Sequence, residues 1–224
     1  MPGLGFTARR RLSPRIFTFR ADTRRRGSAT SINRQETDMK NDPHANASPR
    51  DESGLNLNIG TYEEALTWIG RSLDTAFGDV EVNAPMIQYY CSAMQDANPS
   101  YWDRDFAAEH WGGQIAPPGM LQTWIIPLQW RPDGARIVSA MAVKVPLPGD
   151  KPINVSTEFE YFKPVRVGDI LNVTDRLIDI SAEKTTKLGT GHFITTVADY
   201  RNQRGELVAT NTNVFFRYRT ASDD

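Results

Sequence analysis

The sequence predicts an α+β fold in which a curved antiparallel sheet wraps around one central apolar helix. Patterns typical of helices come first, and patterns typical of long strands fill the chain after Gly134. Helices followed by a block of strands indicate this fold class. The segment from Pro118 to Leu128 is apolar on nearly every side, which is typical of a helix buried inside the fold.

Four helical segments are expected in the first part of the folded region. Thr61 opens a sequence with the form of a capping box, and apolar residues follow at helical spacing until Gly78, where this helix should end. Asn83, followed by an early proline, is a suitable cap for the second helix. The other two are a short helix at Asp105–Trp111 and the apolar helix at Pro118–Leu128.

Long strands rich in β-branched and aromatic residues are expected in the second part. Asn202–Gly205 and Val165–Asp169 have the composition of tight turns between them. The expected strands are Arg136–Val145, Val155–Lys163, Ile170–Glu183, Thr186–Arg201 and Leu207–Tyr218. A sheet of this kind rolled around one helix is the hot-dog arrangement, which we assign to residues 61–220.

Residues 1–60 are predicted to be a disordered tail, because they are polar and have no sustained apolar period. Residues 1–34 contain nine arginines and one acid, so they carry a charge of +8 and leave −9 for the other 190 residues. Residues 1–38 could be an organelle transit peptide, a basic arm, or upstream sequence if translation starts at Met39. We expect the tail to be dispensable for folding.

Composition excludes several functional classes. The net charge of −1 gives no overall bias toward nucleic acid or anionic membranes, and no apolar run approaches the roughly 18 residues of a membrane span. One cysteine, Cys91, and three scattered histidines form no metal-ligand cluster, and no nucleotide-binding fingerprint is present. We therefore expect no cofactor, no metal, no nucleic acid and no membrane partner. The expected location is cytoplasmic, or mitochondrial if the arginine-rich start is a transit peptide.

The segment most informative about chemistry runs from Tyr90 to Asp103. Asp96 and Asn98 leave the end of a helix, and the proline after Asn98 makes the turn rigid and fixes the direction of the acid. Two interpretations follow from these residues alone. Asp96 is either a catalytic acid held in a fixed direction or a structural helix exit without a catalytic role.

This segment resembles the hydratase motif of MaoC-like proteins, Asp-x-Asn-Pro-x-His, in which the aspartate and the histidine hold a water molecule. Asp96 and Asn98 occupy matching positions, whereas Tyr101 stands where the family has its histidine. The segment Gly112–Leu121 resembles the family's oxyanion site, in which the glycine at the matching position of Gly119 offers its backbone N–H to the thioester carbonyl. The two prolines before Gly119 have no N–H, so Gly119 would carry the first free donor at a helix N-terminus, although plain helix initiation by proline also explains them.

The resemblance covers about residues 61–218 and is closest to the MaoC dehydratase N-terminal-domain branch, similar to subunits of heteromeric enoyl-CoA hydratases. It implies reversible addition of water to a 2-enoyl thioester to give the (3R)-hydroxyacyl form. Asp96, Tyr101 and Gly119 would then be catalytic, and Asn98, Met120 and Trp124 would bind substrate. The two bulky side chains suit a large apolar acyl group.

The resemblance also implies partners, namely an acyl-CoA or acyl-carrier thioester and a second hot-dog domain in a homo- or heterodimer. Because Tyr101 replaces the histidine, we expect the chain to share or complete its site with that second domain. Two other functions stay open. The chain could be a non-catalytic acyl-binding subunit that shapes the tunnel for a catalytic partner, or a hot-dog acyl-CoA thioesterase.

Overall fold

A computed structural model describes residues 56–128, 130–132, 134 and 139–220. The predictions for residues 1–55, which include the transit peptide and the alternative start at Met39, lie outside the described residues. Asn58 and Gly60 form backbone hydrogen bonds with Val143 and Leu147, so the chain contacts the folded domain from these residues onward. No helix among the described residues is both long enough and apolar enough to cross a membrane.

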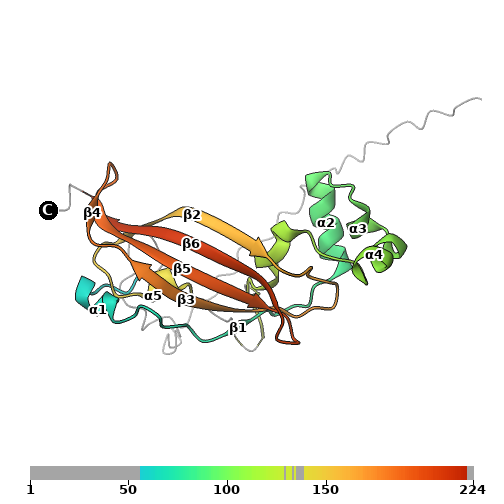
Figure 1. The fold of residues 1–224 in the computed structure, drawn as a ribbon, viewed down its shortest axis with the longest axis horizontal. Coiled ribbons are helices and arrows are strands. Elements are labelled where there is room, and N and C mark those ends of the chain that lie inside the picture. Colours follow the sequence, from blue (N-terminus) through green and yellow to red (C-terminus); the bar gives the residue numbers. More distant parts are fainter. Residues whose placement is uncertain (1–55, 129, 133, 135–138, 221–224) are drawn as a thin grey trace, which may run out of the picture. The chain divides into compact units, whose positions relative to one another are not determined.

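The core of the structure is an antiparallel sheet in the order β1-β3-β5-β6-β2, with β4 paired to β5 (Figure 1). The three long pairings are β3 with β5, β5 with β6, and β6 with β2. The strands are β1 (Ala76–Phe77), β2 (Lys151–Tyr161), β3 (Asn172–Ile180), β4 (Lys184–Thr185), β5 (Thr190–Arg201) and β6 (Leu207–Arg219). The prediction of an α+β hot-dog fold is confirmed by this sheet and by the structural comparison given below.

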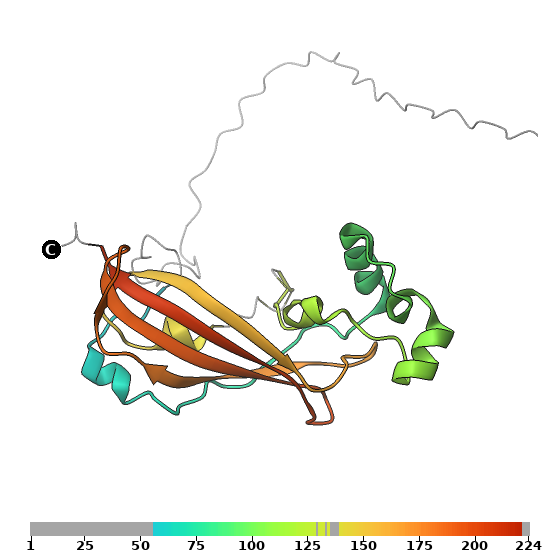
Figure 2. The same ribbon diagram turned by 45° about the horizontal axis from the view of Figure 1, so that its top comes forward.

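The helices are short. They are α1 (Tyr62–Leu66), α2 (Ala84–Met94), α3 (Pro99–Trp102), α4 (Arg104–Trp111), the 3-10 helix η1 (Pro118–Trp124) and α5 (Met141–Lys144). Figure 2 shows α2, α3 and α4 as one green group beyond the end of the strands. The short helix α5 contacts β3 and β5. The second predicted helix is confirmed, with the Asn83 side chain accepting a hydrogen bond from the Met86 amide.

The prediction of one long central helix is wrong in length and type. A 3-10 helix of seven residues stands at Pro118–Trp124, and it does not continue to Leu128. Pro127 explains the early end, because proline has no N–H for the helix and also disfavours a helical conformation at Ile126 before it. The buried character is confirmed for Met120, Leu121 and Trp124.

The first helix is also shorter than predicted. It ends at Leu66, and Gly70 (φ 86°) turns the chain into the extended segment that carries the edge strand β1. Gly78 does not stop a helix. It is needed because a Cβ there would collide with the backbone carbonyl of Trp124.

The strand predicted at Arg136–Val145 is wrong where the structure describes it, because residues 141–144 form α5. Met141, Ala142 and Lys144 are good helix formers, and the carboxylate of Asp175 accepts a hydrogen bond from the Met141 amide at 2.7 Å. The other long strands are confirmed with shifted ends. The turns at Gly168 (φ 88°) and Gly205 (φ 75°) are confirmed as well.

The buried apolar residues fall into two separate clusters. The first lies around Trp124 and includes Ala198, Tyr200 and Ala209 of the sheet. The second lies around α5 and includes Leu177 and Ile194, with Phe215 packed against it. Both clusters use the same face of β5 and β6. The polar residues Thr196 and Asn213 lie between them on that face.

Arg217 of β6 joins the first described residues to the sheet. Its side chain is fully buried, and it donates hydrogen bonds to the backbone carbonyls of Gly149 (2.9 Å), Val145 (2.8 Å) and Asn58. A guanidinium has five N–H donors in a fixed plane, so one side chain satisfies carbonyls from segments far apart in the sequence.

We predict that Arg217→Met lowers the free energy of unfolding by about 3 kcal/mol or more, because buried carbonyls lose charged donors. Arg219→Met is the matched control on the same strand. Arg219 is exposed, and its guanidinium nitrogen lies 3.8 Å from a carboxylate oxygen of Glu183. Its replacement should therefore lower the free energy of unfolding by no more than about 0.5 kcal/mol. Urea unfolding of both variants measures the difference, and equal midpoints would contradict the role given to Arg217.

Candidate functional site

The end of α2 places Asp96 in a turn that the sequence strongly constrains. Gln95 adopts a left-handed conformation (φ 56°) and stops the helix. One oxygen of Asp96 accepts a hydrogen bond from the Asn98 amide at 3.0 Å, and the Asn98 side chain accepts one from the Ser100 amide at 3.0 Å. Asn98 is therefore the cap of α3. The other oxygen of Asp96 makes no hydrogen bond with any residue that the structure describes.

Tyr101 lies on α3, near enough to Asp96 to be influenced by its charge. Its side chain is 7% exposed, and burial followed by the negative charge of Asp96 raises the pKa of its hydroxyl. The neighbouring thiol of Cys91 is also buried, and burial together with Asp96 raises its pKa. Tyr101 is thus a hydrogen-bond donor at neutral pH and a poor base.

Gly119 stands exposed at the start of η1, and no carbonyl of the described residues accepts its N–H. The next amide, that of Met120, donates a hydrogen bond to the Pro117 carbonyl. A Cβ at Gly119 would come within 2.7 Å of the Tyr90 hydroxyl oxygen. A side chain at this position would displace the Tyr90 hydroxyl, whereas glycine lets two donors, an amide and a hydroxyl, stand next to each other.

Tyr90 was not among the predicted site residues. It lies on α2, and no local pattern in the sequence links it to Gly119. The Tyr90 hydroxyl forms no hydrogen bond with the described residues. It lies near Tyr101 and Tyr161, and it contributes to the raised pKa of each.

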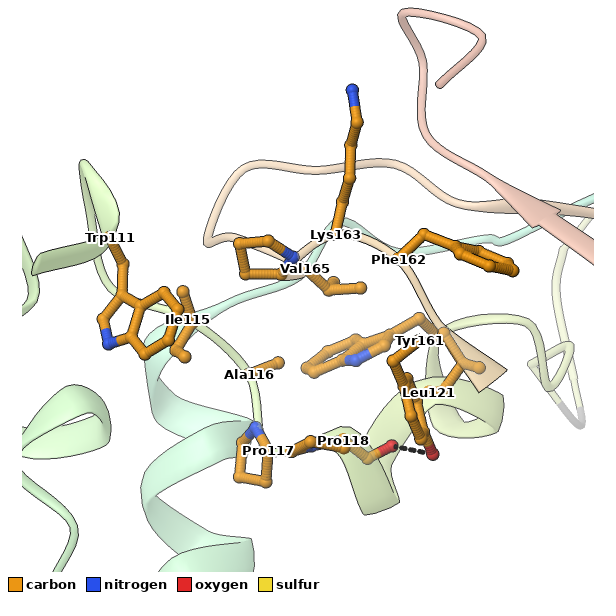
Figure 3. A pocket seen from close by; sticks show the side chains of 12 residues that line it. Trp111, Ile115, Ala116, Pro117, Pro118, Leu121, Tyr161, Phe162, Lys163 and Val165 are labelled. Atoms are coloured by element: carbon orange, nitrogen blue, oxygen red, sulfur yellow. Dashed lines mark hydrogen bonds between the residues drawn. The ribbon is translucent and has the colours of Figure 1, made fainter. Parts of the chain in front are cut away.

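Tyr161, the last residue of β2, fixes the start of η1 against the sheet. Its hydroxyl donates to the Pro118 carbonyl at 3.1 Å, shown as the dashed line in Figure 3. Burial and then Tyr90 raise its pKa. Together, Tyr90 and Tyr161 approach Pro118 and Gly119 from a helix and from a strand.

An apolar cavity of about 300 Å³ is lined by Pro118 and Tyr161 (Figure 3). Its walls are almost entirely apolar, and the amino end of Lys163 points away from them in Figure 3. Trp124 lines the cavity, and its indole N–H is buried without an acceptor among the described residues. The lining residues are Trp111, Ile115, Ala116, Pro117, Pro118, Leu121, Trp124, Tyr161, Phe162, Lys163, Pro164 and Val165.

The structure brings some of the predicted site residues together and separates others. Asp96 and Tyr90 are both near enough to Tyr101 to raise the pKa of its hydroxyl, and the Tyr90 hydroxyl lies against Gly119. Asp96 itself lines a different, open hollow between α2 and α3, which shares no residue with the apolar cavity. Met120 is buried in the core and lines neither space, whereas Trp124 lines the cavity. Among the described residues, no group of three His, Cys, Asp or Glu side chains could hold a metal ion.

Comparison with known proteins places this geometry in a family. The chain is 35% identical over 167 residues to a probable enoyl-CoA hydratase alpha subunit of Thermomonospora curvata, covering 70% of this chain and 52% of the relative. It is 30% identical over 131 residues to the 3-oxo-4,17-pregnadiene-20-carboxyl-CoA hydratase alpha subunit of Mycobacterium tuberculosis, covering 50% of this chain and 37% of the relative. The chain therefore spans about half the length, or less, of these curated relatives.

Among solved structures, the ChsH1-ChsH2 complex from Mycobacterium tuberculosis contains a chain that superposes with a TM-score of 0.56 at 24% identity. The match covers 71% of this chain and 92% of that one, and it shows the shared fold. A family model described as FAS1-like, dehydratase domain region, matches residues 67–211. The chain belongs to this FAS1-like dehydratase family, and its resemblance to MaoC-like hot-dog hydratases and dehydratases is confirmed.

Proposed function

We propose that the chain is a subunit of an (R)-specific 2-enoyl-CoA hydratase, or 3-hydroxyacyl-thioester dehydratase, that shares its site with a partner hot-dog domain. The observation that carries this proposal is the close approach of the Tyr90 hydroxyl to Gly119, near Tyr101, whose pKa is raised in part by Asp96 and by Tyr90. Two free donors, the Gly119 N–H and the Tyr90 O–H, stand next to Pro118 of the apolar cavity, and the acid with one free oxygen, Asp96, lines the separate open hollow. The alpha-subunit names of two relatives support the same reaction class and a heteromeric enzyme.

The geometry accounts for each need of the hydration. A base must take a proton from water while the oxygen of that water forms a bond to the β-carbon, and the electron pair of the double bond moves onto the thioester oxygen. Asp96 is the base in this scheme. The Gly119 N–H and the Tyr90 O–H donate to the thioester oxygen as it becomes an enolate, and the proton that Asp96 took from the water is then passed to the α-carbon, which completes the addition and regenerates the carboxylate.

The proposed substrate is an acyl-CoA thioester whose acyl group is largely apolar. The cavity of about 300 Å³ has largely apolar walls and is lined by Pro118, the residue before Gly119. One relative is named for a ring-containing carboxyl-CoA, which supports a bulky acyl group.

The proposed partner binds along β2. This strand has eleven residues, lies at the edge of the sheet, and is exposed along most of its length. A long open edge is a template for pairing with a strand of another chain. The hollow around Asp96 is open as well, so a second domain could also complete the site there.

A second candidate function is a non-catalytic subunit that binds the acyl thioester for a catalytic partner. The specific observation in its favour is the burial of Tyr101 in the position of the family histidine. A buried tyrosine with a raised pKa does not pass protons near neutrality, whereas a histidine does. The two functions differ in whether Asp96 is needed.

We predict that the isolated chain hydrates a trans-2-enoyl-CoA slowly, and that Tyr101→His raises the rate by up to about 10²-fold because it restores a second acid/base beside Asp96. Asp96→Asn in the Tyr101→His background should remove the gain. Tyr101→Phe is the size-matched control and should give no gain. Full activity of the wild-type homo-oligomer, unchanged in Tyr101→Phe, would refute the assigned deficit.

Adding a histidine-bearing partner subunit should restore activity to the wild-type chain. If Asp96→Asn then has no effect, the partner performs the chemistry and the second candidate function is correct. If Asp96→Asn abolishes the activity of the complex, the site is shared.

We predict that Tyr90→Phe lowers kcat of the assembled enzyme by about 10²–10³-fold, the usual cost of one oxyanion donor. Gly119→Ala should cause a comparable loss, because its Cβ displaces the Tyr90 hydroxyl. In the Tyr90→Phe background the same Gly119→Ala change should add little, since the nearest remaining ring atom is 3.7 Å away. Additive losses in kcat would show that the two residues do not act on the same space.

We predict that Val155→Lys weakens association at least about tenfold, because a charge on the exposed edge opposes strand pairing. Val155 is 54% exposed on β2. Leu188→Lys is the control, since Leu188 is 48% exposed in the turn between β4 and β5. Light scattering over a concentration series measures both, and an unchanged dimer in Val155→Lys would place the interface elsewhere.

A further inference from the structure

Trp111 belongs to two parts of the site. It is the last residue of α4 and lines the apolar cavity, and Figure 3 shows it at one side of that cavity with Tyr161 at the other. Its indole N–H donates a hydrogen bond to the Ser100 hydroxyl at 2.9 Å. Ser100 is buried on α3 and directly precedes Tyr101. One side chain therefore contacts both the cavity and the helix that carries Tyr101.

The short helix α3 depends on its neighbours for its position. It has four residues, and a helix of that length is not stable by itself in water. Besides the bond from Trp111, the Gln114 side chain donates to the Tyr101 carbonyl at 2.5 Å. Trp111 and Gln114 lie in the segment 111–118, which also forms much of the cavity wall. The wall of the cavity and α3 are thus held together by side-chain hydrogen bonds.

The position of α3 in turn determines where Asp96 lies. The amide of Asn98, the cap residue of α3, donates to one carboxylate oxygen of Asp96 at 3.0 Å. The indole N–H of Trp102, the last residue of α3, donates to the Asp96 carbonyl at 2.8 Å. Asp96 is therefore bonded to both ends of α3, and a displacement of this helix moves the acid with it.

The indole of Trp111 is the part of this connection that a ligand can reach. The backbone of Trp111 is held in place, because the Arg166 guanidinium donates to its carbonyl at 2.8 Å. The residue is 42% exposed, so the chain leaves part of it uncovered. Burying apolar ring surface against an acyl group is favourable, and it restricts the orientations of the indole. Orientation matters here, since a hydrogen bond weakens steeply as its angle departs from linear.

We propose that Trp111 is a positioning residue. An acyl group packed against its indole in the apolar cavity orders α3 through the Ser100 hydrogen bond, and α3 then holds Asp96 and Tyr101 in place. The inference rests on the proposed function, since it takes the occupant of this cavity to be the acyl group of a thioester. It adds a dependence of the site on acyl length, because an acyl group too short to cover the indole leaves α3 unchanged.

Two saturated acyl-CoAs isolate the contribution of the acyl group, and neither of them can be hydrated. Tyr161 contacts Pro118 next to Gly119, whereas Trp111 lies at the other side of the cavity (Figure 3). A butanoyl group bound at Gly119 should therefore leave the indole uncovered, and a decanoyl group should cover it. Hydrogen-exchange mass spectrometry on the full-length chain, saturated with either ligand, follows the amides of residues 96–104.

In the wild-type chain, decanoyl-CoA should slow exchange at residues 96–104 about 2- to 10-fold more than butanoyl-CoA does, the range that one hydrogen bond contributes. Trp111→Phe keeps an aromatic ring at the cavity and removes the N–H, so decanoyl-CoA should still bind but without the additional slowing. Ser100→Ala removes the acceptor of the same bond and should have the same effect. The double variant should lose nothing more.

Trp102→Phe is the matched control. Trp102 is 43% exposed, and its N–H also bonds to this turn, but it does not line the apolar cavity. Its replacement should speed exchange at residues 96–104 with and without ligand, and leave the additional slowing by decanoyl-CoA intact. A merely structural role of Trp111 would give this same pattern. Equal additional slowing in Trp111→Phe and in the wild type would therefore overturn the proposal.

The comparison of the two ligands in the wild-type chain stands even if a variant fails to fold. Binding of decanoyl-CoA without additional slowing would overturn the role of Trp111 and leave the proposed function intact. Failure of both acyl-CoAs to bind, measured by calorimetry, would overturn both the proposed function and this inference.

Discussion

The pairing of β5 with β6 is the constraint on which the rest of the structure depends. It joins twelve residues of one strand to thirteen of the other, and both β3 and β2 pair with its outer edges. Because side chains alternate between faces along a strand, this one register decides which residues of the sheet face inward. It places Ala198 beside Asn211 and Thr196 beside Asn213 on the inner face. A shift of the register by one residue would turn Asn211 and Asn213 to the outer face of the sheet.

The second determinant is the junction before η1. Pro117 and Pro118 cannot donate, so the amide of Gly119 is the first donor that reaches solvent. The chain then holds this junction in place from two sides, through the Tyr161 hydroxyl on the Pro118 carbonyl and the Tyr90 hydroxyl above Gly119. A short 3-10 helix suffices for this purpose. It ends at Trp124, and a cavity of about 480 Å³ lies between the residues that follow it and the sheet.

The sequence predicted the fold class, the cap of α2, the long strands and both glycine turns, because each depends on local spacing or on a residue with special backbone freedom. It failed where a distant contact decides. Residues 141–144 have strand-like apolar character, yet Asp175 caps them as a helix from another strand. Gly78 has the composition of a helix stop, yet the Trp124 carbonyl requires it. The Asp96 turn was predicted from its motif, whereas Tyr90 came into view only when α2 and η1 were placed together.

Burial raises the pKa of both Tyr101 and Asp175, with different consequences. Burial and then the charge of Asp96 raise the pKa of the Tyr101 hydroxyl, so it stays a hydrogen-bond donor and does not exchange protons near neutral pH. Burial also raises the pKa of the Asp175 carboxyl, and one of its oxygens accepts from the Met141 amide, which joins α5 to β3. A partner domain could supply the proton transfer that Tyr101 lacks, because the hollow around Asp96 is open.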